Sequence, residues 1–298
     1  MVTRDWLAVP VATPGRGARA WKGMVSFGRR KPVAALSAFV ILLLVVIALF
    51  APQLAPYPYD QPHVRDRLQG PSASYWLGTD GTGRDTFSRI LYGARVTVIV
   101  SFGAVALSTL ISGTIGIVTG YFGGLLDTLA QRLVDIWMSL PGLVLIISVI
   151  AVFGAGITQL LVILGIVSAG GTSRIIRSAT IAIRNSTYIE AAHAVGVPHS
   201  RVMLRYILPN VLPTMIVVAT VQLGGVILAE SALSFLGYGV PPPFPSWGAM
   251  LNTSTTQHML KQPMLSVWPG LAITLTVFSF NMLGDGLRDV LDPRMRGG

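Results

Sequence analysis

Long uncharged apolar runs dominate the chain and predict membrane-spanning helices. A helix needs about 20 predominantly apolar residues to cross roughly 30 Å of hydrocarbon. Segments of suitable length lie at residues 32–51, 95–119, 128–153, 157–181, 209–235 and 267–288. The first is too long for the core of a cleaved signal peptide, and no convincing small-residue cleavage site follows it. The pattern therefore predicts an all-α integral membrane protein with six transmembrane helices.

Polar stretches divide the chain further. Residues 1–31 are rich in Gly, Pro, Ala and Arg without an apolar period, which is typical of a disordered basic arm. Residues 52–93 should form an external segment that ends in a helix near 85–92, whose apolar positions favour a helix lying on the membrane surface. Residues 94–288 would then hold a core of five helices, and 289–298 a short tail.

Composition supports the membrane class. Of the 298 residues, 52% are hydrophobic and 11% charged, and the mean hydropathy is +0.65. Soluble domains carry roughly 25% charged residues. The chain has no cysteine, which excludes disulfides, thiolate metal sites and a cysteine nucleophile.

The positive charge is unevenly placed. Of the formal net charge of +10, residues 1–31 carry +6 and residues 174–206 carry +4. Basic residues next to membrane spans stay preferentially in the cytoplasm. We therefore expect both segments to be cytoplasmic, and six crossings would place both termini inside. Binding to nucleic acid is the weaker interpretation of the arm, because no aromatic stacking platform accompanies its charge.

One polar island stands between two of the longest apolar runs, with the sequence YIEAAHAVGVPHSRVMLRYILPN at 188–210. Thr187 and Glu190 have the spacing of a capping box, which predicts a helix from about Tyr188. Gly196 should end this helix, and Pro198 suits the first turn of a second short one. The first helix would be only about eight residues, or roughly 12 Å, long.

The island has the composition of a contact surface. Alanines leave much of the short helix thin enough for another protein to approach closely, and Glu190 adds one charge. An ordinary capped loop between two membrane helices is the alternative. The series Glu190-Ala191-Ala192, with Gly196 six residues after the glutamate and then RYILPN, resembles the EAA loop of bacterial ABC importer permeases.

Three further segments extend this resemblance from Trp76 to Arg294. They are LGTDGTGRDTFSRILYGAR at 77–95, SALSFLGYGVPPPFPSWGAML at 231–251 and FNMLGDGLRDVLDPR at 280–294. They are similar to the C-type permease of bacterial dipeptide, oligopeptide and nickel importers. The resemblance implies a type I ABC importer permease fold in the bacterial inner membrane, and one half of a translocation pathway for dipeptides or oligopeptides.

The resemblance also implies partners and site residues. The loop at 185–208 would be a coupling helix that docks on a cytoplasmic ATPase, with Glu190, Ala191, Ala192, Gly196 and Arg201 as the docking residues. Partners would be a B-type permease, two ATPase subunits or domains, an extracytoplasmic peptide-binding protein and the lipid bilayer. ATP and Mg would bind the ATPase subunits, and no cofactor is expected in this chain.

No motif supports chemistry within the chain. A phosphate-binding loop ends in Gly-Lys-Ser/Thr, yet none of the three lysines follows a glycine, and there is no nucleophile elbow or HExxH helix. Transport would draw on another subunit or on an ion gradient. The alternative function is a self-sufficient secondary transporter or channel, a class that usually shows repeats or several ionisable residues at the membrane midplane. Only Glu230 is a candidate for such a residue, and hence for the solute pathway.

Several smaller expectations follow from local patterns. Asp80 and Asp85 flank glycines but lack calcium-loop spacing, so a turn followed by an Asp cap is favoured. Trp247, after a proline-rich loop, would anchor at the membrane interface. Residues Asp285, Arg288 and Asp289 have helical spacing and would form local ion pairs, or else contact an ATPase.

The histidines and the glycines give two further expectations. Histidines at 193, 199 and 258 lack metal-ligand spacing, and we expect the first two to be solvated. Glycines at 103, 113, 116 and 120 should permit close helix packing.

Overall fold

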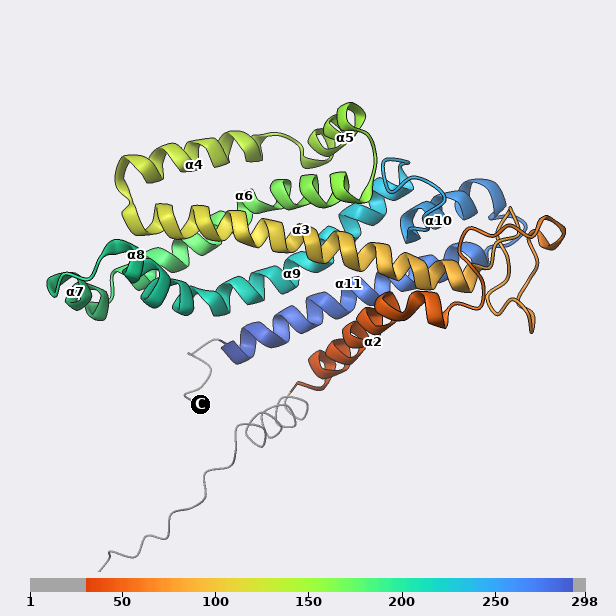
Figure 1. The fold of residues 1–298 in the computed structure, drawn as a ribbon, viewed down its shortest axis with the longest axis horizontal. Coiled ribbons are helices and arrows are strands. Elements are labelled where there is room, and N and C mark those ends of the chain that lie inside the picture. The colour runs from red at the N-terminus through yellow and green to blue at the C-terminus, as the bar shows by residue number, and fades with distance from the viewer. Residues whose placement is uncertain (1–30, 292–298) are drawn as a thin grey trace, which may run out of the picture.

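The computed structural model describes residues 31–291, which form a bundle of helices and one long irregular segment at 55–85 (Figure 1). The arm expected at 1–31 lies outside the described residues except for Lys31, and most of the expected tail also lies outside them. The helices are α2 (Pro32–Leu54), α3 (Thr86–Phe122), α4 (Gly124–Ser139), α5 (Gly142–Phe153), α6 (Ile157–Arg184), α7 (Thr187–Ala194), α8 (His199–Val202), α9 (Leu208–Phe235), α10 (Trp247–Thr253) and α11 (Met264–Leu291).

Five helices in the described part of the chain are long and apolar enough to cross a membrane. They are α2, α3, α6, the continuous helix His199–Phe235 and α11. A sixth span exists if α4 and α5 count as one, but these two helices meet at an angle of 83°. The span expected at 128–153 is therefore not one continuous helix but a broken pair. The break falls at Leu140, which is extended because the following Pro141 disfavours helical geometry. The all-α membrane class is confirmed.

The centre of the bundle is the packing of α3 against α6. A Cβ added to Gly116 of α3 would lie 2.8 Å from the Cβ of Ile176 in α6. At Gly120 it would lie 2.8 Å from the Cβ of Thr180. Small residues thus let the two backbones approach closely, as expected where lipid offers no hydrophobic drive between helices.

The irregular segment ends in the predicted turn and cap. The Asp80 carboxylate accepts hydrogen bonds from Thr82 and Arg84, and Asp85 accepts one from the Ser88 backbone N–H at 2.8 Å. Among residues 31–291 there is no cluster of His, Cys, Asp or Glu suited to a metal ion. The helix expected near 85–92 is not a separate surface helix. It forms the first turns of α3, because no proline interrupts the chain before the apolar run and the single Gly93 is tolerated within the helix.

Trp247 is not an interfacial anchor, contrary to expectation. Its side chain is only 2% exposed, its Nε1–H donates to the Ile90 carbonyl at 3.0 Å, and its indole lies against Gly93. The missing side chain at Gly93 provides the space for the ring. Trp247 therefore joins α10 to the first turns of α3 inside the bundle.

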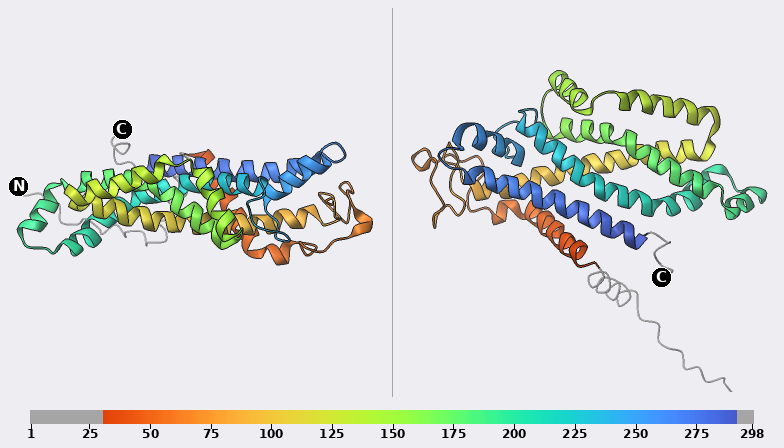
Figure 2. Two further views of the ribbon diagram at one scale, coloured as in Figure 1. Left: turned by 90° about the horizontal axis from the view of Figure 1, so that it is seen from above. Right: turned by 180° about the vertical axis from the view of Figure 1, so that it is seen from behind.

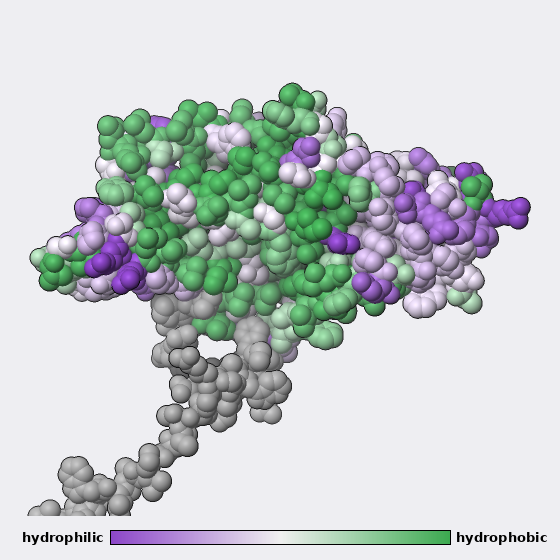
Figure 3. All heavy atoms as spheres, viewed as in Figure 1, coloured by the Kyte–Doolittle hydropathy of each residue, from purple (hydrophilic) through white to green (hydrophobic). Residues whose placement is uncertain are grey.

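The bundle is elongated, with polar residues gathered at both ends and an apolar middle (Figure 3). Further views show α2 and α11 side by side along one flank (Figure 2). The ion pairs expected within the end of α11 are corrected here: Asp289 pairs with Lys31 Nζ at 2.6 Å, and Asp285 and Arg288 form no ion pair within the described range. The start of α2 therefore meets the end of α11.

Candidate functional site

The polar island forms the tip of the bundle opposite the irregular segment and α10 (Figure 1). Only α7 is an isolated short helix there. The π-helical turn Met203–Ile207 continues α8 directly into α9, so the expected second short helix is the start of a long one. Pro198 stands just before this helix, as its N-cap residue.

The start of α7 differs from the predicted capping box. Ser186 is the N-cap residue and Thr187 is already helical. The Ser186 hydroxyl does not cap α7, because it donates instead to the Ile183 carbonyl in the preceding helix at 2.6 Å. The Glu190 side chain makes no hydrogen bond or ion pair with the residues that the structure describes, and it is exposed at the tip.

The end of α7 is the one predicted at Gly196. This residue has φ of +77°, in the left-handed region that favours glycine. The Val197 N–H donates to the Ala192 carbonyl at 3.0 Å, and the Gly196 N–H donates to the His193 carbonyl at 2.9 Å. These two bonds make a Schellman motif, which satisfies carbonyls at the end of the helix. No atom lies within 4 Å of a Cβ built on Gly196, so backbone conformation alone demands the glycine.

The two faces of α7 differ sharply. Its inner face is buried through Ile189, 1% exposed, and Ala192, both packed on the bundle. Its outer face exposes Glu190 and Ala191, and the adjoining Val195 is 79% exposed. Arg201 is exposed on α8. Exposed apolar side chains rimmed by polar residues are typical of a protein-binding surface.

A contact that sequence reasoning missed holds this tip to α3. Tyr121, in the last turn of α3, has its hydroxyl 2.6 Å from His199 Nδ1 and 3.4 Å from His193 Nε2. The two histidines were expected to be merely solvated. Both are exposed on one side but also contact a tyrosine that is only 5% exposed. No sequence signal linked residues so far apart.

Glu230 lies away from the residues at the tip. It sits in the last third of α9, is 1% exposed, and accepts a hydrogen bond from the Ser234 hydroxyl at 2.8 Å. The Ser231 hydroxyl lies 3.5 Å from its other carboxylate oxygen. In this conformation its carboxylate is enclosed within the bundle.

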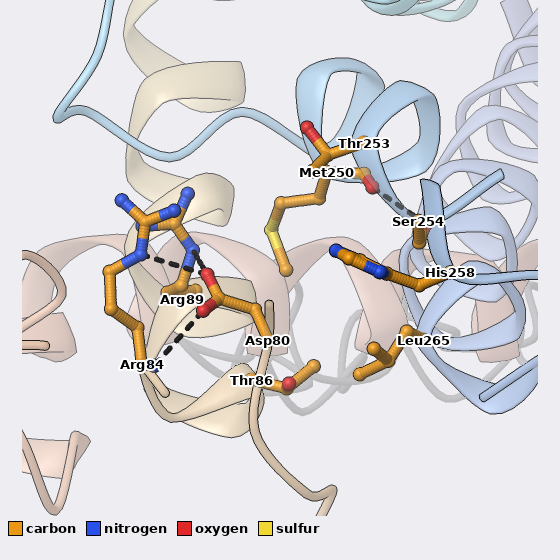
Figure 4. Close-up of a pocket in the computed structure, with 9 residues that line it drawn as sticks. All are labelled: Asp80, Arg84, Thr86, Arg89, Met250, Thr253, Ser254, His258 and Leu265. Carbon is orange, nitrogen blue, oxygen red and sulfur yellow. Dashed lines mark hydrogen bonds and ion pairs between the residues drawn. The ribbon is translucent and has the colours of Figure 1, made fainter. Parts of the chain in front are cut away.

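A polar pocket marks the opposite end, between the irregular segment and α10 (Figure 4). The Asp80 carboxylate accepts a hydrogen bond from Arg84 Nε at 2.8 Å, and Arg89 Nε lies 3.7 Å from the same carboxylate oxygen. Burial raises the pKa of Asp80, but the Thr82 hydroxyl, the Arg84 N–H and the two guanidinium groups outweigh it and hold the pKa below the usual value. The cavity of about 40 Å³ is far smaller than the roughly 300 Å³ of a small ligand site. The pocket is therefore a polar joint between the irregular segment, the start of α3 and α10.

The class that the fold defines is an all-helical membrane protein with a short exposed helix at one polar tip (Figure 1). Residues 112–297 match the family of binding-protein-dependent transport system inner membrane components. Residues 20–71 match the N-terminal transmembrane domain of oligopeptide transport permease C. The chain belongs to the family of binding-protein-dependent transport system inner membrane components, and it is a permease subunit of an ABC importer.

Individual relatives agree with this assignment. The chain is 40% identical over 276 residues to the dipeptide transport system permease protein DppC of Alkalihalophilus pseudofirmus, covering 93% of this chain and 90% of the relative. It is 38% identical over 291 residues to the glutathione transport system permease protein GsiD of Escherichia coli O1:K1 / APEC, covering 97% and 96%.

A solved structure shares the fold. An inward-facing form of the MetNI methionine ABC transporter superposes with a TM-score of 0.57 at 18% identity, covering 68% of this chain and 96% of that chain. The resemblance to a C-type importer permease is thus confirmed. The protein is a multi-pass inner membrane protein, and ATP hydrolysis in this family resides on partner subunits.

Proposed function

We propose that the chain forms one half of a membrane channel through which dipeptides, oligopeptides or similar small solutes enter the cell. The other half would be a related B-type permease. The relatives at 38–40% identity are named for dipeptide and glutathione transport, which supports a small peptide as the solute. Solute selection itself would reside largely in a separate extracytoplasmic binding protein.

Coupling to ATP is assigned to α7 and the turn after it. The supporting observation is the contrast between the buried inner face at Ile189 and the exposed outer surface around Val195. Glu190, Ala191, Ala192, Gly196 and Arg201 are the proposed docking residues. Of these, Ala192 faces inward, so its role is to keep α7 close to the bundle. Two ATPase subunits would bind ATP and Mg, and their closure would carry α7 with them.

The proposed orientation puts the tip with α7 in the cytoplasm and the irregular segment outside. This orientation is supported by the net charge of +4 on residues 174–206. Basic loops next to membrane spans lie preferentially on the cytoplasmic side. Both termini would be cytoplasmic, and the binding protein would deliver solute to the end that contains α10.

Because Glu230 is buried, it would line the proposed pathway only in a conformation in which α9 has rotated about its own axis. Its carboxylate is bonded to serines of its own helix, so it can rotate with α9 without losing those partners.

Purification of a tagged chain in detergent from its native host tests this function. We expect a second permease and ATPase subunits to co-purify, and an associated binding protein to narrow the solute. Recovery of the chain alone, together with solute movement in liposomes under an ion gradient, would contradict the proposal and support a secondary transporter.

A further inference from the structure

Tyr121, His193 and His199 form a compact cluster, called here the tyrosine–histidine cluster, where three elements meet. Tyr121 belongs to α3, His193 to α7 and His199 to α8. The rings of Tyr121 and His193 are stacked with centroids 6.0 Å apart, and the two imidazole centroids are 5.5 Å apart. The histidines lie on either side of the turn at Gly196, so one tyrosine contacts both arms of the turn.

The hydrogen bonds of the cluster are mutually compatible. A phenol hydroxyl donates one hydrogen bond and accepts others, while a neutral imidazole donates from one nitrogen and accepts at the other. The Tyr121 hydroxyl can donate to His199 Nδ1 at 2.6 Å while it accepts from His193 Nε2–H at 3.4 Å. The shorter of these contacts is the stronger one.

No other side-chain hydrogen bond joins residues 187–202 to the remainder of the described chain. The other side-chain contacts of this segment are largely apolar, through Ile189 and Val202, while backbone hydrogen bonds from Ile189 and Glu190 to the Ser186 carbonyl hold the start of α7 near the end of α6. Apolar contact is non-directional, whereas a hydrogen bond requires a defined distance and angle. The cluster therefore fixes the position of α7 relative to α3 more closely than the apolar contacts do.

The tyrosine end of the cluster is firmly held. Gly120, which directly precedes Tyr121, lies so close to α6 that an added Cβ would be 2.9 Å from the Arg177 carbonyl oxygen. From there α3, which is 37 residues long in all, runs back to the Asp85 cap beside the irregular segment. A displacement of α7 that is passed to Tyr121 would thus reach a continuous helix leading to the opposite end.

We infer that the tyrosine–histidine cluster makes α7 and the end of α3 move as one body, and so sets how much solute is carried per ATP hydrolysed. These are positioning residues that act through α7. The inference rests on the proposed docking of α7 on an ATPase, and it adds the route by which movement of that helix enters the bundle.

The test uses the complete importer, purified from its native host and reconstituted in liposomes, with solute uptake and ATP hydrolysis measured together. Tyr121→Phe keeps the ring and removes only the hydroxyl. We expect this variant to lower the solute carried per ATP about fivefold. This is about the factor by which loss of one ordinary hydrogen bond changes an equilibrium constant. The amount of co-purified ATPase should be unchanged.

Matched variants separate this role from general packing. Tyr238→Phe removes the hydroxyl of an exposed tyrosine at the opposite end, one without a hydrogen bond within the described range, and should leave the ratio unchanged. His199→Asn places an amide near the Nδ1 position, whose oxygen can accept from the Tyr121 hydroxyl, and should retain most of the ratio, whereas His199→Ala should lose it. Wild-type ratios in both Tyr121→Phe and His199→Ala would overturn the inference.

Failure of the cluster can be told apart from failure of the docking proposal. If Gly196→Val also leaves the ratio unchanged, the docking proposal fails. If Gly196→Val lowers the ratio and Tyr121→Phe does not, only the inference about the cluster fails.

A distance measurement gives a second readout. Because the chain has no cysteine, spin labels can be placed at Thr114→Cys and Ser200→Cys alone, both at exposed positions. We expect their distance distribution to stay narrow when ATP is added, and to broaden in the Tyr121→Phe background. Identical distributions in both backgrounds would overturn the inference.

Discussion

Gly196 is the residue on which the shape of the proposed docking loop depends most directly. Its φ of +77° costs an L-residue roughly 1–2 kcal/mol. We expect Gly196→Val to reduce uptake coupled to ATP hydrolysis severalfold while membrane insertion is retained. Measurement of uptake and ATPase rate in proteoliposomes checks this.

Two variants calibrate that result. Gly196→Asn should lose less, because asparagine tolerates left-handed geometry. Gly225→Ala is a control in α9, where a Cβ meets no atom within 4 Å and φ is not positive. Equal activity of Gly196→Val and wild type would contradict the role given to this turn.

Trp247 tests the packing of the end that contains α10. Truncation of a buried tryptophan to alanine typically costs about 3–5 kcal/mol. We expect Trp247→Ala to lower the thermal stability of the detergent-solubilised protein strongly, since both the packing on Gly93 and the hydrogen bond to Ile90 are lost. Trp76→Ala, at a residue 59% exposed, should change the stability little. Similar small shifts in both variants would contradict the buried position.

Individual residues were predictable from sequence where the cause is local. Gly196 ends α7 and Asp85 caps α3 because the backbone needs that residue type there. The cap of α7 was misplaced by one residue, since Ser186 and Thr187 are both residue types preferred at an N-cap. The contacts of Tyr121 could not be predicted, because they join residues 72 and 78 positions apart. The burial of Trp247 was missed for the same reason.

At the scale of elements, the pair α3 and α6 is the rigid part of the bundle. Gly116→Leu would force a side chain into a space where even a Cβ lies 2.8 Å from the Ser173 carbonyl oxygen. Overpacking of this kind typically costs about 1–3 kcal/mol. We expect lower thermal stability in detergent, with Gly225→Leu as a control whose stability is near that of the wild type. Unchanged stability in Gly116→Leu would contradict the close α3–α6 packing.

The apolar runs predicted most elements because hydrophobic length is a strong signal for a membrane helix. Two outcomes needed the structure. The break between α4 and α5 follows from Pro141, but an apolar run does not reveal a bend of 83°. The expected surface helix is instead continuous with α3, because the connecting residues Tyr92–Val96 contain no proline.

At the scale of the whole molecule, single-cysteine labelling tests the proposed orientation. The absence of native cysteine allows Ser74→Cys in the irregular segment and Ser200→Cys in α8 to be labelled singly. We expect a membrane-impermeant maleimide to label Ser74→Cys in cells with an accessible periplasm and to label Ser200→Cys only after the inner membrane is permeabilised. The reverse pattern would contradict the proposed orientation.

The central claim is that the tip formed by α7 meets an ATPase. The most direct measurement places a photo-crosslinking amino acid at Val195, 79% exposed beside Gly196, and in a second variant at Trp76 on the opposite end. Illumination of the intact importer should join Val195 to an ATPase subunit and should give no such product from Trp76. An importer that hydrolyses ATP but yields no ATPase product from Val195, or yields one from Trp76, would contradict the account.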